Sequence, residues 1–224
     1  MAERGLLIVL EGGEGVGKTT QWNRLVTRLQ ELGHEVIALR EPGGSPPGDV
    51  IRSLLLGPDH ELAPATEALL FAASRAELVS RSVRPALERG VIVVLDRYLL
   101  STYVYQGVAR GLPMDGLRAM NDFATGGLVP DCTLLLRLPL DEAMARTRAR
   151  GAPDRLEQET DGFHARVAAG FDVSVSEQWQ AEHPECGPIE PISAAGTPDE
   201  VALRCYDVLA RRWPARFAGT AAAR

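Results

Sequence analysis

A glycine-rich segment with a single lysine is the part of the sequence best suited to chemistry. Residues 11–20 read EGGEGVGKTT, in which four residues separate Gly12 from Gly17, and Lys18 and Thr19 follow directly. This is the spacing of a phosphate-binding P-loop. Glycines let successive backbone N–H groups face phosphate oxygens, the lysine ammonium reaches the β- and γ-phosphates, and the threonine hydroxyl ligates Mg²⁺. The pattern predicts a site for the polyphosphate of a nucleotide.

Lys18 is also the only lysine in the chain. The guanine-reading Asn-Lys-x-Asp motif of GTPases needs another lysine, and so does the upstream signature of deviant P-loop partition ATPases. The sequence therefore excludes both of these P-loop classes.

Two further segments place charged side chains directly after short apolar runs that predict strands. Arg40 and Glu41 follow one run, and Asp96 and Arg97 follow the next. The carboxyl ends of parallel strands are where open α/β sheets bind ligands. We therefore expect Asp96 to bind Mg²⁺, directly or through water, and Arg97 to direct its guanidinium group into the same crevice. For Arg40 and Glu41, a connector with a structural ion pair is the alternative to a role in binding.

Phe71 and Arg75 are one turn apart on a predicted helix, so they share a face. An aromatic residue on a helix usually belongs to the core, whereas a buried guanidinium needs partners. The pair could also hold a flat heterocycle, the ring by stacking and the guanidinium by donating to its edge. The residues by themselves leave both interpretations open.

Four arginines crowd the interval around Gly151, at positions 146, 148, 150 and 155. A solvated charged face is the ordinary interpretation of such a run. In a chain whose formal charge is −6, the cluster instead creates a local positive field. We expect a mobile lid over a polyphosphate, at about residues 148–158.

These residues must be positioned by alternating strands and helices. Apolar runs predict five strands, at 6–10, 35–39, 91–95, 132–138 and 188–192. Helical spacing predicts helices from the P-loop to Leu32, at 49–56, 65–89, 115–125, 141–151 and 163–179, and from an N-cap at Thr197 onward. Pro85 is expected to kink its helix or start a new one, and the Pro/Gly-rich stretch 40–48 to lack regular structure. The pattern predicts a single α/β domain over 1–217, a five-stranded parallel sheet with helices on both faces, and a disordered tail at 218–224.

The composition of the chain indicates its size class and its cellular compartment. The chain has 224 residues, 45% of them hydrophobic and 24% charged, which suits one globular domain. Its negative charge argues against nucleic-acid binding. Three widely spaced cysteines indicate a reducing compartment, and neither a signal peptide nor a membrane span is expected. We predict a cytoplasmic protein.

Segments along almost the whole chain resemble the thymidylate kinase family. They are EGGEGVGKTT, REPGGSP, LLFAASR, DRYLLSTYVYQG and RTRARGAPDRLEQE, in this order. The resemblance implies a P-loop NTPase fold and the reaction ATP + dTMP → ADP + dTDP with Mg²⁺. It also implies a homodimer.

The resemblance assigns candidate site residues in sets. Those expected to bind ATP are Gly12, Gly13, Glu14, Gly15, Val16, Gly17, Lys18, Thr19, Thr20, Arg148 and Arg155. Those expected to bind dTMP are Glu14, Arg40, Phe71, Arg75, Arg97, Ser101, Thr102, Tyr105 and Gln106. The expected metal ligands are Thr19 and Asp96. By resemblance, Phe71 stacks on thymine, Arg75 binds its edge, Glu14 reaches the deoxyribose and Tyr105 crowds the 2′ position.

The expected catalytic residues are Lys18, Arg97 and Arg150. One subgroup of the family carries a catalytic arginine in the P-loop, where this chain has Gly15, and the other supplies it from the lid. The chain resembles the second subgroup, which makes Arg150 the candidate. It departs from the family at residues 171–173, Phe-Asp-Val, where a Tyr-Leu run is usual, and nothing is transferred to 180–187.

Two other functions are compatible with the P-loop. Another nucleoside or nucleoside-monophosphate kinase would keep the loop but not the Phe71/Arg75 pair. A non-enzymatic nucleotide switch would lack a second anion site, which Arg40 and Arg97 are expected to form.

Overall fold

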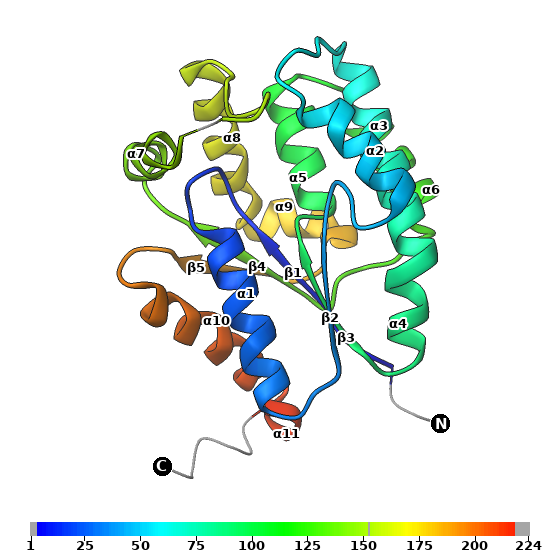
Figure 1. Cartoon of the computed structure of the whole chain (residues 1–224), viewed down its shortest axis with the longest axis vertical. Helices are drawn as coiled ribbons and strands as arrows, with labels where there is room; N and C mark the ends of the chain where they lie inside the picture. Colours follow the sequence, from blue (N-terminus) through cyan, green and yellow to red (C-terminus); the bar gives the residue numbers. More distant parts are fainter. Residues whose placement is uncertain (1–3, 152, 218–224) are drawn as a thin grey trace.

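A five-stranded, all-parallel sheet lies at the centre of the chain in its computed structural model (Figure 1). The structure describes residues 4–151 and 153–217, with Arg150 by its backbone alone. The strand order is β2-β3-β1-β4-β5. The strands are β1 (Leu7–Glu11), β2 (Val36–Arg40), β3 (Ile92–Asp96), β4 (Cys132–Arg137) and β5 (Ile189–Ser193). The predicted sheet is confirmed.

Both faces of the sheet are buried because each central strand is apolar along its length. Alternate side chains of β1 enter two separate cores: Leu7 and Val9 one, Ile8 and Leu10 the other. The Ile8 core is covered by α1 (Lys18–Glu31), α10 (Pro198–Arg212) and α11 (Pro214–Phe217). Helices therefore cover both faces, as predicted.

The Leu7 core is covered by helical segments from the middle of the chain. The remaining helices are α2 (Pro46–Leu56), α3 (Pro64–Leu78), α4 (Arg84–Glu88), α5 (Leu99–Thr102), α6 (Met114–Thr125), α7 (Leu140–Arg150), α8 (Asp161–Ser174) and α9 (Glu177–Glu182). A wider π-helical turn, Val79–Val83, links α3 to α4, and another, Tyr103–Ala109, continues α5. A 3₁₀ turn, Pro184–Cys186, precedes β5.

The helix boundaries correct two predictions. The stretch 40–48 is not irregular throughout, because Ser45 caps α2 by accepting a hydrogen bond from the Gly48 N–H and proline is tolerated in a first helical turn. A single helix at 163–179 is also wrong. It ends at Ser174, and Ser176 caps α9 through the Trp179 N–H.

Two proline-containing segments behave as expected. Pro85 lies in the first turn of α4, after a π-helical turn. Thr197 caps α10 in a complete capping box with Glu200.

The stretch 180–187, which matched no family pattern, packs beside the helices that carry the candidate site. His183 stacks on Trp179 at 4.1 Å between ring centroids, and Glu185 accepts a 2.6 Å hydrogen bond from the Tyr103 hydroxyl. The stretch thus buttresses the π-helical segment of Tyr103. Among the described residues, no helix combines the length and the apolar character needed to cross a bilayer.

Candidate active site

A cavity of about 900 Å³ opens at the carboxyl ends of the strands. Most of the predicted site residues line it. These are Glu14, Gly15, Val16, Gly17, Lys18, Thr19, Thr20, Arg40, Phe71, Arg75, Asp96, Arg97, Ser101, Thr102, Tyr105 and Gln106. Predicted residues that do not line it are Gly12, Gly13, Arg148 and Arg155, while the Arg150 side chain lies outside the described residues. Its volume is near the upper end of the range for ligand pockets in proteins.

The P-loop bends where glycine is required. Gly15 and Gly17 have φ angles of 72° and 91°, a region that favours glycine. A Cβ at Gly15 would lie 1.9 Å from the Ala143 carbonyl oxygen of α7. In this arrangement no arginine fits at position 15.

Lys18 lies within the bend of the P-loop. Its Nζ donates hydrogen bonds to the carbonyl oxygens of Gly12 (2.9 Å) and Gly13 (2.6 Å). Burial and the nearby charge of Arg97 lower the pKa of Lys18. The site therefore holds a cation whose charge an incoming anion would stabilise.

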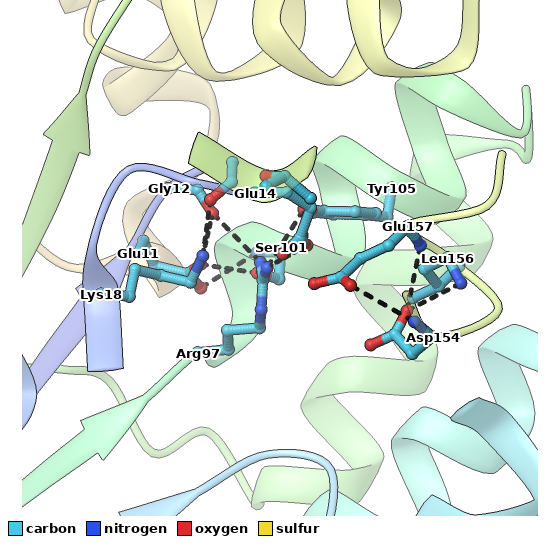
Figure 2. Close-up of polar contacts among 12 residues, drawn as sticks. Glu11, Gly12, Glu14, Lys18, Arg97, Ser101, Tyr105, Asp154, Leu156 and Glu157 are labelled. Carbon is cyan, nitrogen blue, oxygen red and sulfur yellow. Dashed lines mark hydrogen bonds and ion pairs between the residues drawn. The ribbon is translucent and has the colours of Figure 1, made fainter. Parts of the chain in front are cut away.

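Arg97 lies between the P-loop and the helix that follows β3 (Figure 2). Its guanidinium donates to Glu14 Oε1 at 2.5 Å, Ser101 Oγ at 3.0 Å and the Gly12 carbonyl at 3.2 Å. Glu14 also accepts a 2.8 Å hydrogen bond from the Tyr105 hydroxyl. Burial opposes the charge of Arg97, but Tyr105 and the neighbouring carboxylates raise its pKa. A fixed, charged arginine thus faces the phosphate cradle.

Glu11 is a supporting residue that sequence analysis did not assign. It is fully buried and accepts hydrogen bonds from the Tyr98 and Ser101 N–H groups and from Ser101 Oγ, at 2.9, 3.0 and 2.6 Å. Burial raises the pKa of Glu11. The carboxylate connects β1 to the helix start that carries Ser101, and Ser101 in turn contacts Arg97. Its position inside the glycine-rich segment was the available signal.

Phe71 and Arg75 line the same cavity from α3. Phe71 is half-buried, whereas Arg75 is 1% exposed. The Arg75 guanidinium donates to Glu41 Oε2 and Asn121 Oδ1 at 2.7 Å, Thr102 Oγ1 at 2.9 Å and the Tyr98 carbonyl at 3.1 Å. The buried guanidinium therefore has the partners that its burial demands. Its contact with a base edge stays a prediction, as does stacking on Phe71.

Glu41 forms the structural ion pair with Arg75 that was the alternative to a binding role. Its carboxylate is buried and also lines the cavity. Burial outweighs the effect of Arg75 and raises the pKa of Glu41 from 4.5 to about 7. Glu41 therefore holds a proton in the folded chain at pH values where the unfolded chain has released it.

This shift predicts a pH dependence of stability that Glu41→Gln removes. Because the folded-state pKa is raised, the contribution is fully present below about pH 4.5 and is lost as the pH rises through about 7. The unfolding free energy of the wild type relative to Glu41→Gln should thus fall between about pH 5 and 7 and stay level above. Urea denaturation of both proteins across this range is the measurement. A difference that rises with pH would contradict the assignment.

Thr19 and Asp96, the predicted metal ligands, both line the cavity. The Oδ1 atom of Asp96 is buried and has no hydrogen-bond partner. An unsatisfied carboxylate oxygen at this place fits a cation or its water ligand. Within the described ranges, no group of three or more histidine, cysteine or acidic side chains forms a metal site. Mg²⁺ that accompanies a nucleotide is held largely by the phosphates and does not require such a group.

The structure places the arginines around Gly151 in different surroundings. Arg155 donates to Glu67 Oε2 and to the Leu55 carbonyl, both at 2.7 Å, which holds its guanidinium on the α3 side. Its contact with ATP stays a prediction. The Arg148 side chain is 72% exposed and 3.9 Å from Asp161. By contrast, Arg146 lines the cavity beside Ala194. Of the arginines in this cluster whose side chains the structure describes, only Arg146 lines the cavity.

Arg52 is another cavity residue that sequence analysis missed. It donates a 2.8 Å hydrogen bond to the Pro42 carbonyl, and burial together with Arg40 lowers its pKa. No motif identifies it in the sequence. Two arginines, Arg40 and Arg52, thus line the cavity near the end of β2.

Comparisons with known proteins agree on one family. The family model described as "Thymidylate kinase" matches residues 10–183. A thymidylate kinase of Synechococcus sp. (strain JA-2-3B'a(2-13)) is 47% identical over 214 residues, which cover 96% of this chain and 98% of that protein. One from Deinococcus radiodurans is 51% identical over 168 residues, covering 75% of this chain and 82% of that protein.

Proposed function

Because the chain belongs to the thymidylate kinase family, we propose that it transfers the γ-phosphoryl group of ATP to dTMP, giving ADP and dTDP. The observation that carries the proposal is the single cavity shared by the P-loop and Phe71, with Arg97 between them. A phosphate cradle and a half-buried ring that line one cavity suit a triphosphate donor and a nucleotide acceptor. Domain limits of 1–217 and a lid at about 148–158 belong to the same proposal.

No general base is required in this reaction. The acceptor is a phosphate monoester whose second pKa is about 6, so it is already largely dianionic at neutral pH. The residues must hold two anions in line and neutralise the charge between them. Lys18 acts on the donor phosphates, and Arg97 acts on the acceptor phosphate. Arg40 lies at the cavity edge, where it supports the same acceptor.

Thr19 and Asp96 would hold Mg²⁺ together with ATP. When bound, the ion neutralises the donor phosphates and orients them. The unsatisfied Oδ1 of Asp96 supports this assignment.

On the acceptor side, Tyr105 and Glu14 form a hydrogen-bonded pair beside Arg97. We assign Glu14 to the deoxyribose and Tyr105 to the exclusion of a 2′ hydroxyl. Phe71 stacks on the base, while Arg75, Ser101, Thr102 and Gln106 complete the acceptor wall.

The lid prediction concerns Arg150. Replacing Arg150 with alanine is expected to lower kcat by more than about tenfold with little change in dTMP affinity, because the charge is needed in the transition state. Arg81→Ala, which removes an arginine with a 75% exposed side chain outside the predicted site residues, is the control. Steady-state kinetics in both substrates provide the measurement. Near-normal turnover of Arg150→Ala would move the catalytic role to another lid arginine.

We also propose that the chain forms a homodimer. Phe123 on α6 is 92% exposed and Leu69 on α3 is 61% exposed, and these two helices pack against each other. Exposed apolar side chains on neighbouring helices suit an interface between copies.

A coupled ADP-release assay across nucleoside monophosphates tests the function. The expected result is activity with dTMP well above that with dAMP, dGMP or dCMP, and weaker activity with dUMP, since one methyl group is worth only about 1–3 kcal/mol. Preference for another monophosphate, or for a nucleoside, would favour a different P-loop kinase. Nucleotide binding without turnover would favour a switch.

A further inference from the structure

Glu67 is a fully buried carboxylate behind the acceptor end of the cavity. It lies on α3, one turn before Phe71. Its oxygens accept hydrogen bonds from Gln106 Nε2 at 2.9 Å, from Arg155 Nη2 at 2.7 Å, and from Arg110 Nη2 and Nε at 3.0 and 3.2 Å. Of these partners, only Gln106 lines the cavity.

The ionisation of Glu67 decides how Gln106 is turned. Burial opposes the charge, but hydrogen bonds from Arg110, Gln106 and Arg155 lower the pKa of Glu67. An ionised carboxylate accepts hydrogen bonds and donates none. The Gln106 amide must therefore direct its NH₂ group at Glu67. Because Gln106 lines the cavity, its oxygen, Oε1, is left available to a ligand there.

A fixed acceptor distinguishes among pyrimidines. Thymine and uracil carry an N–H donor at N3, between two carbonyl groups. Cytosine carries a lone pair at N3, which would face the Gln106 oxygen without a proton between them. A site with a fixed polar group rejects a ligand that leaves the group unpaired much more strongly than an apolar pocket rejects a missing methyl.

We propose that Glu67 is a positioning residue for base selectivity: it locks the Gln106 amide so that Oε1 accepts the N3–H of thymine or uracil and excludes cytosine. The proposal rests on the proposed function, because it takes the base to lie beside Gln106. It assigns the buried carboxylate a role in specificity in addition to its ion pairs with Arg110 and Arg155.

The test compares kcat/KM for dTMP, dUMP and dCMP in the wild type and in Glu67→Gln, measured by ADP release. A glutamine at position 67 can donate as well as accept, so Gln106 can turn. We expect the dTMP/dCMP ratio to fall by more than about tenfold, while the dTMP/dUMP ratio, which depends on the methyl group, stays within about twofold. A merely structural role would lower all three values together.

Glu159→Gln is the matched control. Glu159 lies 2.6 Å from Arg110 Nη2, so the variant removes a carboxylate from the same arginine without touching Gln106. Its dTMP/dCMP ratio should equal that of the wild type. The exchange variant Glu67→Gln with Gln106→Glu should recover discrimination, because residue 106 is again an acceptor facing the base.

Folded Glu67→Gln with an unchanged dTMP/dCMP ratio would overturn the proposal. If Glu67→Gln does not fold, Glu67→Asp keeps the charge but shortens the side chain by one CH₂ group, which weakens the hydrogen bond from Gln106. An unchanged ratio in this variant would also overturn the proposal. Wild-type protein that does not phosphorylate dTMP would instead refute the proposed function, so the two failures are distinguishable.

Discussion

Replacing Lys18 with methionine is expected to reduce kcat by about 10²–10³-fold. Lys18 holds the only ammonium group of a side chain in the protein, and its Nζ lies 2.9 and 2.6 Å from the Gly12 and Gly13 carbonyls, inside the phosphate cradle. The charge is needed as the β–γ bond breaks, so the loss should appear mainly in turnover and in ATP binding. KM for dTMP should change little. Steady-state kinetics at saturating dTMP give the measurement.

The same variant should fold normally. Burial and Arg97 lower the pKa of Lys18, which means that the folded chain does not favour this cation. Loss of the two hydrogen bonds to the Gly12 and Gly13 carbonyls opposes the gain from removing the cation, so we expect the free energy of unfolding to fall by no more than about 3 kcal/mol. Lys18→Arg serves as the control for charge alone. Its planar fork does not reproduce a compact ammonium held by two carbonyls, so it should remain strongly impaired. Turnover of Lys18→Met within tenfold of the wild type would contradict the catalytic role.

Replacing Arg97 with alanine or glycine is expected to lower kcat/KM for dTMP by about 10²–10³-fold in both variants. Each removes the guanidinium that contacts Glu14, Ser101 and the Gly12 carbonyl. ATP binding should be affected less than dTMP turnover. Initial rates with each substrate varied in turn provide the comparison.

The two Arg97 variants should differ in stability. Arg97 has a φ of 70°, the one described non-glycine residue in the left-handed region. That conformation costs an alanine roughly 1–2 kcal/mol and costs glycine little. Arg97→Gly should therefore be more stable than Arg97→Ala by about 1 kcal/mol in urea denaturation, after allowing for the greater freedom of unfolded glycine. The reverse order would show that this backbone conformation is not held by the fold.

Hydrogen bonds around Arg97 explain its left-handed backbone conformation. Its N–H donates to the Leu10 carbonyl, and the next N–H, that of Tyr98, donates to Glu11. These bonds fix the turn after β3, and the turn aims the guanidinium back at Glu14. Positioning and strain thus come from the same contacts.

The phosphate cradle, the sheet and about half of the cavity lining were predictable from sequence because they depend on local patterns. Glycine spacing dictates the P-loop turn, and apolar runs such as Leu7–Glu11 form strands buried on both faces. A parallel sheet then brings the ends of β1, β2 and β3 to one edge. For that reason Lys18, Arg40 and Asp96 line one cavity.

Only the tertiary structure decided which buried charges act together. Glu11 meets Ser101 across 90 positions, and Glu67 meets Arg155 across 88 and Gln106 across 39. Such partners depend on how helices pack, which the spacing of residues within one segment does not specify. Arg155 illustrates the physical reason. In sequence it belongs to a cluster of arginines suited to ATP, but a buried carboxylate on α3 requires a cation, and the folded chain supplies this one.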